Sequence, residues 1–345
     1  MRTNLLYRVA YGCSLLLLAS SVAPAQVVSA ADAAQHLRKL SDATSLDREG
    51  LHPWHLRMTF QLFDMNGKAK DKGTIEEWWV SPTSRRIEIK SGSLNETFPA
   101  APGAPVVHNR ESYLVGLLLQ QVIHPVPDYG GPDQVTVSEA KEPIVSVKTD
   151  FRCFRISAAK ARGRGGRGAG TQYCAEVNAD VLRIHYDSGG FADVRNRLAT
   201  FQKVSLALDN NISYGNKQAI MGHVEALEGY DAAKQPLELA SAPKDVAVLP
   251  GLVTESNLVK RVAPVYSVAA QGQHQSGEVL FCAIIDKQGK VESFDVVTSP
   301  DTLLTNTAIT SIKQWQYKPY LVNGEPVAVD TTITVNFELR DFDEQ

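Results

Sequence analysis

Apolar and polar residues alternate near the end of the chain. From Val327 to Leu339 every odd position except Thr331 is apolar, and most even positions are polar. An alternation of period two that is rich in Val, Ile and Thr predicts a strand with one buried face. Residues 277–285 and 290–297 have a similar composition and flank a polar turn ending in Gly289, so they predict a β-hairpin.

The chain between this hairpin and the final strand has the spacing of a helix. Leu304, Ala308, Ile312 and Trp315 recur at intervals that place them on one side of a helix. Asp301 precedes them, where its carboxylate can accept hydrogen bonds from the first turn. We expect this helix to pack on the buried face of the sheet.

The preceding part of the chain predicts mostly antiparallel strands with few helices. Helices are expected near residues 32–40 and over residues 111–122, the second stopping before Pro125. The fold class is therefore α+β. Strands are expected at residues 54–63, 73–80, 85–89, 144–147, 153–156, 173–177, 182–186, 201–206 and 221–227.

The composition divides the chain into two globular parts. An Ala- and Pro-containing stretch without periodicity, residues 241–255, predicts a linker between a β-rich domain at 31–240 and a smaller domain at 256–345. A chain of 345 residues with 43% hydrophobic content suits two domains of ordinary size. The net charge of -3 gives no indication of a nucleic-acid partner.

Residues 1–30 resemble a secretory signal peptide. Two arginines precede a short apolar run, and small residues follow it, which predicts cleavage near Gln26 or Ala31. The alternative is an uncleaved inner-membrane anchor, because no charged residue occurs from Val9 to Ala31. Polar residues within the segment make it less apolar than a typical membrane span, which favours cleavage.

Several short motifs occur in order between residues 256 and 340: Pro264-Val-Tyr266, Gly277-x-Val279, Gly289-x-Val291, Trp315-x-Tyr317-x-Pro319, Asn323-Gly-x-Pro-Val327 and a Val-x-Phe sequence ending at Phe337. Together they resemble the C-terminal domain of the TonB family. The resemblance implies a β-β-α-β domain in the periplasm of a Gram-negative bacterium. It also implies binding of an extended segment of an outer-membrane TonB-dependent transporter to the edge of the last strand.

The resemblance implies that the partner binds along the edge of the final strand. An unpaired edge offers a row of N–H and C=O groups to any extended peptide. The alternative is an edge covered by the other domain or by a second copy. The chain departs from the energy-transducing members because an N-terminal membrane helix and a long proline-rich spacer are not obvious. The candidate residues are Val329, Asp330, Thr331, Thr332, Ile333, Thr334 and Val335.

A second, looser resemblance concerns the first domain. Its strand-rich meander with one helical insertion resembles the half-barrel carriers of outer-membrane lipoproteins, the LolA/LolB-like proteins. In that fold a curved sheet leaves a concave apolar face that holds acyl chains. The alternative is an ordinary packed core, since aromatic residues routinely fill cores. The candidate lipid-lining residues are Trp54, Phe60, Phe63, Trp78 and Leu118.

The cysteines are consistent with export. Cys153 and Cys174 lie on two predicted strands joined by an Arg- and Gly-rich loop, so a hairpin brings them within reach of a disulfide, which an oxidising periplasm preserves. Cys282 lies inside a predicted strand, as a small buried hydrophobe does. The Arg/Gly run at 162–168 is a candidate contact for anionic lipid headgroups or RNA, but a solvated loop tip explains it more simply.

No motif for catalysis, metal or cofactor binding stands out. Ser188 lacks the preceding glycine of a nucleophile elbow, and the histidines have no metal-ligand spacing. Glu76 and Glu77 fall on opposite strand faces and cannot share one site, which favours a solvent-facing charge on one side. The sequence therefore predicts a non-catalytic protein that binds a transporter or another envelope protein. The alternative is a periplasmic carrier of lipid or lipoprotein, in which the C-terminal domain serves only to dock the protein.

Overall fold

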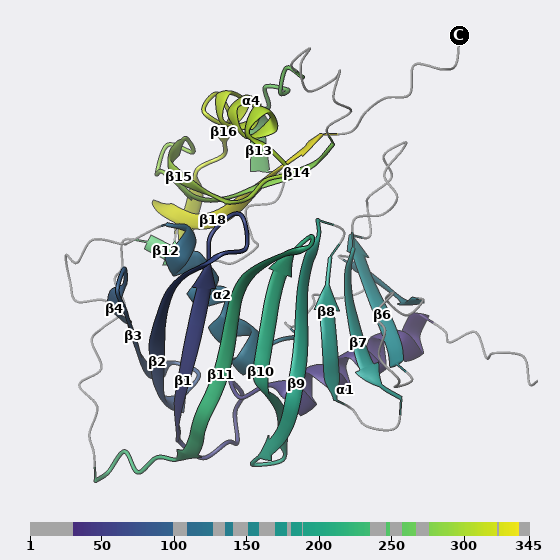
Figure 1. Cartoon of the computed structure of the whole chain (residues 1–345), viewed down its shortest axis with the longest axis vertical. Helices are drawn as coiled ribbons and strands as arrows, with labels where there is room; N and C mark the ends of the chain where they lie inside the picture. The colour runs from purple at the N-terminus through teal and green to yellow at the C-terminus, as the bar shows by residue number, and fades with distance from the viewer. Residues whose placement is uncertain are drawn as a thin grey trace, which may run out of the picture.

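In the residues that it describes, the computed structural model has a large sheet, a small sheet, a two-stranded sheet and three helices (Figure 1). The α+β class and the mostly antiparallel large sheet agree with the sequence prediction. The predicted signal peptide, strand 144–147 and Arg/Gly loop lie outside the described residues, apart from Ala30. The structure describes residues 30–98, 109–126, 135–140, 151–158, 170–177, 181–187, 189–234, 246–248, 257–266, 276–322 and 324–337.

The large sheet has eleven strands in the order β4-β3-β2-β1-β11-β10-β9-β8-β7-β6-β5. Consecutive strands are neighbours in the sheet, except that β4 and β5 lie at its two edges, and β1 lies beside β11. The strands are β1 (Trp54–Phe63), β2 (Ala69–Ser81), β3 (Ser84–Ser91), β4 (Asn95–Phe98), β5 (Val135–Ala140), β6 (Phe151–Ala158), β7 (Thr171–Glu176), β8 (Leu182–Tyr186), β9 (Phe191–Phe201), β10 (Val204–Tyr214) and β11 (Lys217–Gly229).

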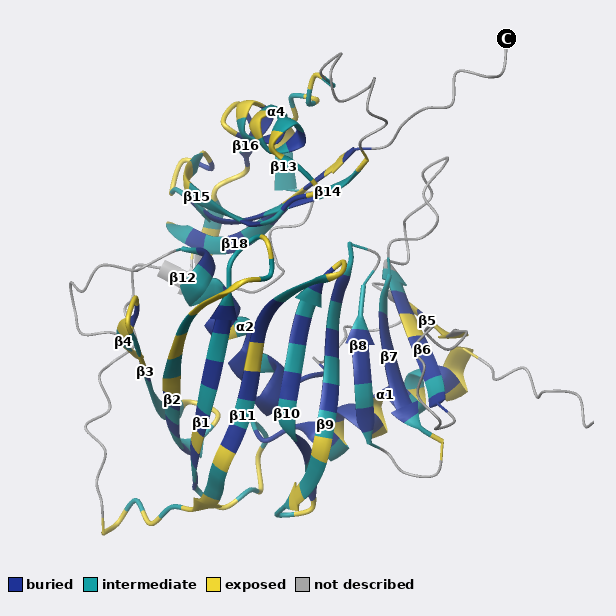
Figure 2. Ribbon diagram, in the orientation of Figure 1, coloured by how far each residue is buried: buried dark blue, intermediate teal, exposed yellow. Residues whose placement is uncertain are grey.

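Helices α1 (Ala30–Thr44) and α2 (Arg110–Ile123) lie on one face of the large sheet (Figure 1). Asn109 begins α2, since its side chain accepts a hydrogen bond from the Ser112 backbone N–H at 2.8 Å. The apolar side of α2 packs closely on the sheet at Gly222, where an added Cβ would lie 2.7 Å from the Leu118 methyl groups. Within the described residues, no element covers the opposite, open face of the strands β9, β10, β11, β1 and β2 (Figure 2).

The small sheet has the order β12-β18-β14-β15, with β17 pairing to β18. Its hairpin and helix confirm the sequence prediction, and the Asp301 carboxylate accepts a hydrogen bond from the Leu304 N–H at 2.9 Å. Short strands between the helix and the last strand go beyond a simple β-β-α-β order. β13 (Leu258–Lys260) and β16 (Gln316–Tyr317) form a separate two-stranded sheet. The other elements are β12 (Val246–Val248), β14 (Gly277–Ile285), β15 (Val291–Thr298), α4 (Thr302–Ile312), β17 (Tyr320–Val322) and β18 (Glu325–Phe337).

The predicted strand at 201–206 is wrong, because a hairpin turn divides it. Strand β9 ends at Phe201 and β10 begins at Val204. The turn residues Gln202 and Lys203 have φ of 47° and 67°, a conformation for which sequence reasoning expects glycine or asparagine. The Gln202 side chain exchanges two hydrogen bonds with the His52 backbone, at 2.8 and 3.0 Å, which stabilises the turn from outside the hairpin.

Arg110, at the start of α2, joins the two sheets. Its backbone N–H donates to Asp295 and its Nε donates to the Val297 carbonyl, both at 2.9 Å, while Nη1 donates to the Phe63 carbonyl at 2.7 Å. Cys282 and Val297 of the small sheet belong to the same buried cluster as the core under α2. The two parts of the molecule therefore share apolar contacts and a buried guanidinium.

Candidate functional site

Strand β18 has one buried face and one paired edge. Residues 329–337 of β18 pair in antiparallel register with the whole length of β14. The side chains of Ile333, Val335 and Phe337 are buried in one cluster with Leu304 and Ile312 of α4. The intervening Thr332 is half-buried and Thr334 is exposed. The period-two pattern of the sequence thus describes this strand correctly.

The second edge of β18 is only partly occupied. Strand β17 pairs with residues 325–327, and β12 runs parallel to residues 328–330. Beyond Asp330, up to Phe337, no strand of the described chain pairs with this edge. Of the predicted partner-binding residues, Val329 and Asp330 therefore lie beside β12. The other five, Thr331, Thr332, Ile333, Thr334 and Val335, lie along the edge that no described strand occupies.

Strand β12 comes from the segment that the sequence predicted to be a linker. Residues 246–248 form a parallel pair with β18, so this part of the segment adds a strand to the small sheet. A parallel pair needs a crossover connection, and the chain passes through β13, the β14–β15 hairpin and α4 before it reaches β18.

The candidate lipid-lining residues do not come together. Trp54, Phe60 and Leu118 are 0%, 3% and 0% exposed and pack in the core between the sheet and α2. Phe63 and Trp78 occupy alternate positions on β1 and β2, so they face the other side of the sheet. Trp78 stacks there on His55, with ring centroids 4.7 Å apart. These five residues therefore divide between two faces and do not line a common cavity.

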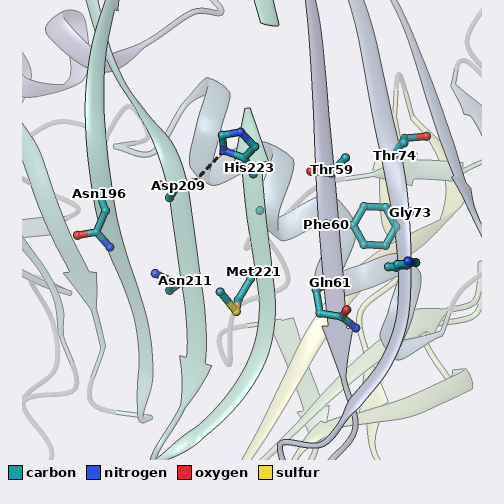
Figure 3. Close-up of a pocket in the computed structure, with 12 residues that line it drawn as sticks. Thr59, Phe60, Gln61, Gly73, Thr74, Asn196, Asp209, Asn211, Met221 and His223 are labelled. Carbon is teal, nitrogen blue, oxygen red and sulfur yellow. Dashed lines mark hydrogen bonds and ion pairs between the residues drawn. The ribbon is translucent and has the colours of Figure 1, made fainter. Parts of the chain in front are cut away.

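A row of polar side chains crosses the open face of the large sheet. Thr74 of β2 is opposite Thr59 of β1, which is opposite His223 of β11; His223 is opposite Asp209 of β10, and Asp209 is opposite Asn196 of β9. The Asp209 carboxylate is 2.9 Å from the His223 Nδ1, and Figure 3 shows this contact beside the other members of the row. One register position therefore collects polar groups from five strands.

A second row lies two residues along each strand. Lys72 is opposite Gln61, Gln61 is opposite Met221, and Met221 is opposite Asn211. The two rows line an open concavity of about 830 Å³, which we call the sheet groove (Figure 3). Sequence reasoning missed it because each strand contributes only alternate polar residues, which look like an ordinary solvated face. The pairing of distant strands brings them together.

Arg197 fixes the carboxylate of the sheet groove. Its guanidinium donates to both oxygens of Asp209 and lies 2.8 Å from the His223 Nδ1. The hydrogen bonds from Arg197 lower the pKa of Asp209, and burial opposes them. Asp209 is therefore an ionised acceptor with a fixed orientation at neutral pH.

A polar network is buried on the opposite face, between the sheet and α2. The Arg195 Nη1 donates to the Gln121 carbonyl at 2.6 Å and to Asp193 at 3.2 Å, and Asn210 donates to both Asp193 oxygens at 3.1 Å. His185 contacts the Gln121 side chain at 2.9 Å, and burial lowers its pKa to about 3. This histidine is neutral and holds α2 against the sheet.

Glu76 and Glu77 lie on opposite faces, as the alternation predicts. Glu76 contacts His55 at 3.0 Å on the open face. Glu77 is fully buried, and its nearest cation is Arg85 at 3.7 Å. Burial raises the pKa of Glu77 to about 8, although Arg85 acts in the opposite direction. Glu77 is thus a core residue whose two carboxylate oxygens have no hydrogen-bond partner in the described chain.

The predicted disulfide joins β6 to β7. Cys153 and Cys174 are directly opposite in register, and the structure links them with an S–S distance of 2.08 Å. Cys282 is free and buried, with its Sγ 3.6 Å from the Asp295 carbonyl. Within the described residues, His, Cys, Asp and Glu side chains form no group of three or more that could hold a metal ion.

The match to a known protein family falls on the part of the chain that contains the small sheet. Residues 262–339 match the family model of the Gram-negative bacterial TonB protein C-terminal. The predicted TonB resemblance is confirmed for this part of the chain. "Protein TonB" of Vibrio cholerae serotype O1 is 31% identical over 109 residues, which are 31% of this chain and 45% of that relative. The chain therefore spans less than half the length of the TonB protein that it matches.

Two solved structures resemble the chain at low identity. The LolA superfamily protein NE2245 from Nitrosomonas europaea is 6% identical, with 58% of this chain and 94% of that chain covered and a TM-score of 0.34. A DUF1329 family protein from Desulfovibrio piger is 7% identical, with coverages of 61% and 99% and a TM-score of 0.36. Scores of this size do not establish a shared fold, so the large sheet is interpreted from its own residues. No helix in the described part of the chain is long and apolar enough to cross a membrane.

Proposed function

We propose that this chain is a non-catalytic periplasmic protein whose β18 receives an extended segment of an outer-membrane TonB-dependent transporter or of another envelope protein. The match of residues 262–339 to the TonB C-terminal family carries the proposal. The edge of β18 beyond Asp330, which no described strand occupies, supplies the surface. Backbone pairing along this edge gives affinity without any dedicated side-chain pocket.

The geometry of the small sheet suits strand addition. Residues 331–337 span about 23 Å at the usual rise of a strand, which is long enough for several backbone hydrogen bonds. Pairing with β14 and packing against α4 fix the twist and the buried face of β18 before any partner arrives. An incoming segment therefore meets a rigid template, which lowers the entropy that binding costs.

The signal-like residues 1–30 and the disulfide support a periplasmic location, because an oxidising compartment preserves disulfides. The alternative function, a carrier of lipid or lipoprotein, gains no support from the candidate lining residues. Trp54, Phe60 and Leu118 pack into the core, and Trp78 faces away from it.

The sharpest test changes the backbone of the partner. Synthetic peptides from transporter amino termini are N-methylated at every second residue, in either of the two possible phases, and their binding to the mature chain is measured by calorimetry. Successive N–H groups of a strand point to opposite edges. One phase should therefore weaken binding by about tenfold or more, while the other should leave it nearly unchanged.

Variants of the chain provide the matching control. Thr334→Pro removes an N–H from the edge strand and obstructs pairing, whereas Thr334→Ser keeps the backbone intact and should bind normally. Thr332→Pro and Thr332→Ser form a second pair. Circular dichroism must first show that each proline variant is folded. Equal affinity for both phases of N-methylated peptide, together with unchanged binding by folded proline variants, would contradict strand addition at β18.

A further inference from the structure

The sheet groove carries hydrogen-bonding side chains that have no partner among the described residues. Thr59, Thr74, Asn196 and Asn211 line it, and their hydroxyl and amide groups make no hydrogen bond within the described chain. They come from four different strands and point to one side of the sheet (Figure 3). A folded protein satisfies such groups with water or with a ligand.

Any ligand of the sheet groove must bind through these side chains. The groove lies in the middle of the large sheet, where β1, β11 and β10 each have a strand on both sides. Their backbone N–H and C=O groups are already used in the sheet, so an added peptide strand finds no free edge here. This separates the groove from β18, where the backbone itself is available.

The chemistry of the sheet groove suits a neutral ligand that is rich in hydroxyl groups. Hydroxyls and side-chain amides both donate and accept hydrogen bonds, and Asp209 adds a fixed acceptor. Met221, 42% exposed, adds one apolar side chain to the second row. Neighbouring strands are about 4.8 Å apart, and residues two apart along a strand are separated by about 6.7 Å. A regular grid of polar groups that includes an apolar side chain matches the alternating hydroxyl and C–H surfaces of linked sugars.

We propose that the sheet groove binds a short oligosaccharide. Glycan chains of the bacterial envelope present segments of this kind. Asp209 and Arg197 form the polar anchor, Thr59, Thr74 and Asn211 contact sugar hydroxyls, and Met221 packs against a ring. This function is separate from partner binding at β18.

The same face of the sheet carries an aromatic surface beside the groove. Trp78 and His55 stack with their rings almost parallel, at an interplanar angle of 6°. They lie four residues from Thr74 and Thr59 on the same two strands, which is about 13 Å at the usual rise. A flat ring of this size offers the apolar area that the C–H face of a further sugar needs. The glycan runs from Asn196 towards Trp78.

Other ligand classes fit the sheet groove less well. A nucleic acid needs several free cations for its phosphates. Lys72 lines the groove, but Arg197 is already paired with the Asp209 carboxylate, which would repel phosphate. An acyl chain needs an enclosed apolar cavity, whereas this groove is open and eight of its twelve lining residues have polar side chains. A sugar needs neither of these features.

Saturation-transfer NMR on the mature chain tests the proposal with three probes: the trimer of N-acetylglucosamine, maltotriose and decanoate. We expect at least one sugar trimer to receive magnetisation and decanoate to receive none. The double variant Asn211→Ala/Thr59→Val should weaken sugar binding by about tenfold, the loss expected for two neutral hydrogen bonds. Thr200→Val, an exposed change on β9 outside the groove, should not affect it.

The outcomes separate this proposal from the function of β18. Thermal melting first confirms that the double variant is folded, and transporter-derived peptides should bind to it as they bind to the unmodified chain. Binding of neither sugar trimer would overturn the proposal, as would binding that the double variant leaves unchanged. Transfer to decanoate alone would assign the groove to an acyl chain instead. Loss of peptide binding with sugar binding intact would affect only the function proposed for β18.

Discussion

At the scale of single residues, the large sheet buries two carboxylates in different ways. Asp193 receives hydrogen bonds from Asn210 and Arg195, so both partners of a buried charge pair are present. Glu77 lies 3.7 Å from Arg85 and has no hydrogen-bond partner for either oxygen in the described chain. Burying a charge costs free energy unless hydrogen bonds compensate for it. The fold therefore favours the protonated form of Glu77.

The stability of the protein should depend on pH through Glu77. Burial raises its pKa from 4.5 to about 8, so between these values the folded state holds a proton that the unfolded state has released. The free energy of unfolding therefore falls as the pH rises through this window, by up to about 1.4 kcal/mol per pH unit. Glu77→Gln removes the titrating group, and we expect a flatter dependence and a more stable protein at the upper end of the window.

Urea unfolding at about pH 5 and about pH 8 measures this difference. The variant Glu225→Gln, at an exposed position on β11, serves as the control and should keep the slope of the unmodified chain. Identical slopes for Glu77→Gln and the unmodified chain would show that Glu77 is ionised in the folded state at both pH values.

At the scale of elements, α4 begins at a side chain that the sequence identifies. The Asp301 carboxylate accepts a hydrogen bond from Leu304, and α4 then covers the buried face of β18. The template offered to a partner strand therefore depends on a helix that one residue caps.

Asp301→Ala should lower the free energy of unfolding by about 1 kcal/mol, because the first turn of α4 loses its cap. Asp301→Asn keeps an acceptor oxygen in the same place and should cost only a few tenths of this amount. Thermal melting of the two variants side by side measures the difference. Equal melting temperatures would mean that another group caps the helix.

The sequence predicted regular elements well and missed what depends on distant pairing. The strand at 277–285 follows from its composition and from the polar turn after it, and the helix after Asp301 follows from the spacing of its apolar residues. The turn at Gln202 and Lys203 could not be predicted, since the His52 backbone that stabilises it lies far away in the chain. The sheet groove was missed for the same reason: Thr59 and Asp209 become neighbours of His223 only when β1 and β10 pair with β11.

At the scale of the whole molecule, Arg110 contacts both sheets. Its side chain is 7% exposed, and its donors reach the Val297 carbonyl of the small sheet and the Phe63 carbonyl of the large one. Burial lowers the pKa of Arg110, and Glu111 and other acids oppose this effect. The junction between the two parts therefore depends on one desolvated cation with carbonyl partners on both sides.

Arg110→Ala should destabilise this junction by about 2–4 kcal/mol, because it leaves buried carbonyl groups without donors. We expect the small sheet to unfold in a separate transition at lower temperature, which differential scanning calorimetry resolves. Arg57→Ala removes the same charge from an exposed position on the open face and controls for net charge. A single transition at an unchanged temperature in Arg110→Ala would show that the apolar contacts alone join the two parts.

The position of β1 beside β11 has a consequence for the order of folding. Trp54 pairs with Gly229, so the first strand of the large sheet meets its permanent neighbour only after the last strand has been made. Hairpins such as β1–β2 and β10–β11 can form early from local contacts, but the seam between them closes a loop of almost the whole domain. The seam should form late in refolding and limit its rate. A chain that cannot complete its sheet during synthesis stays open for longer, which is the condition that passage through a narrow export channel requires.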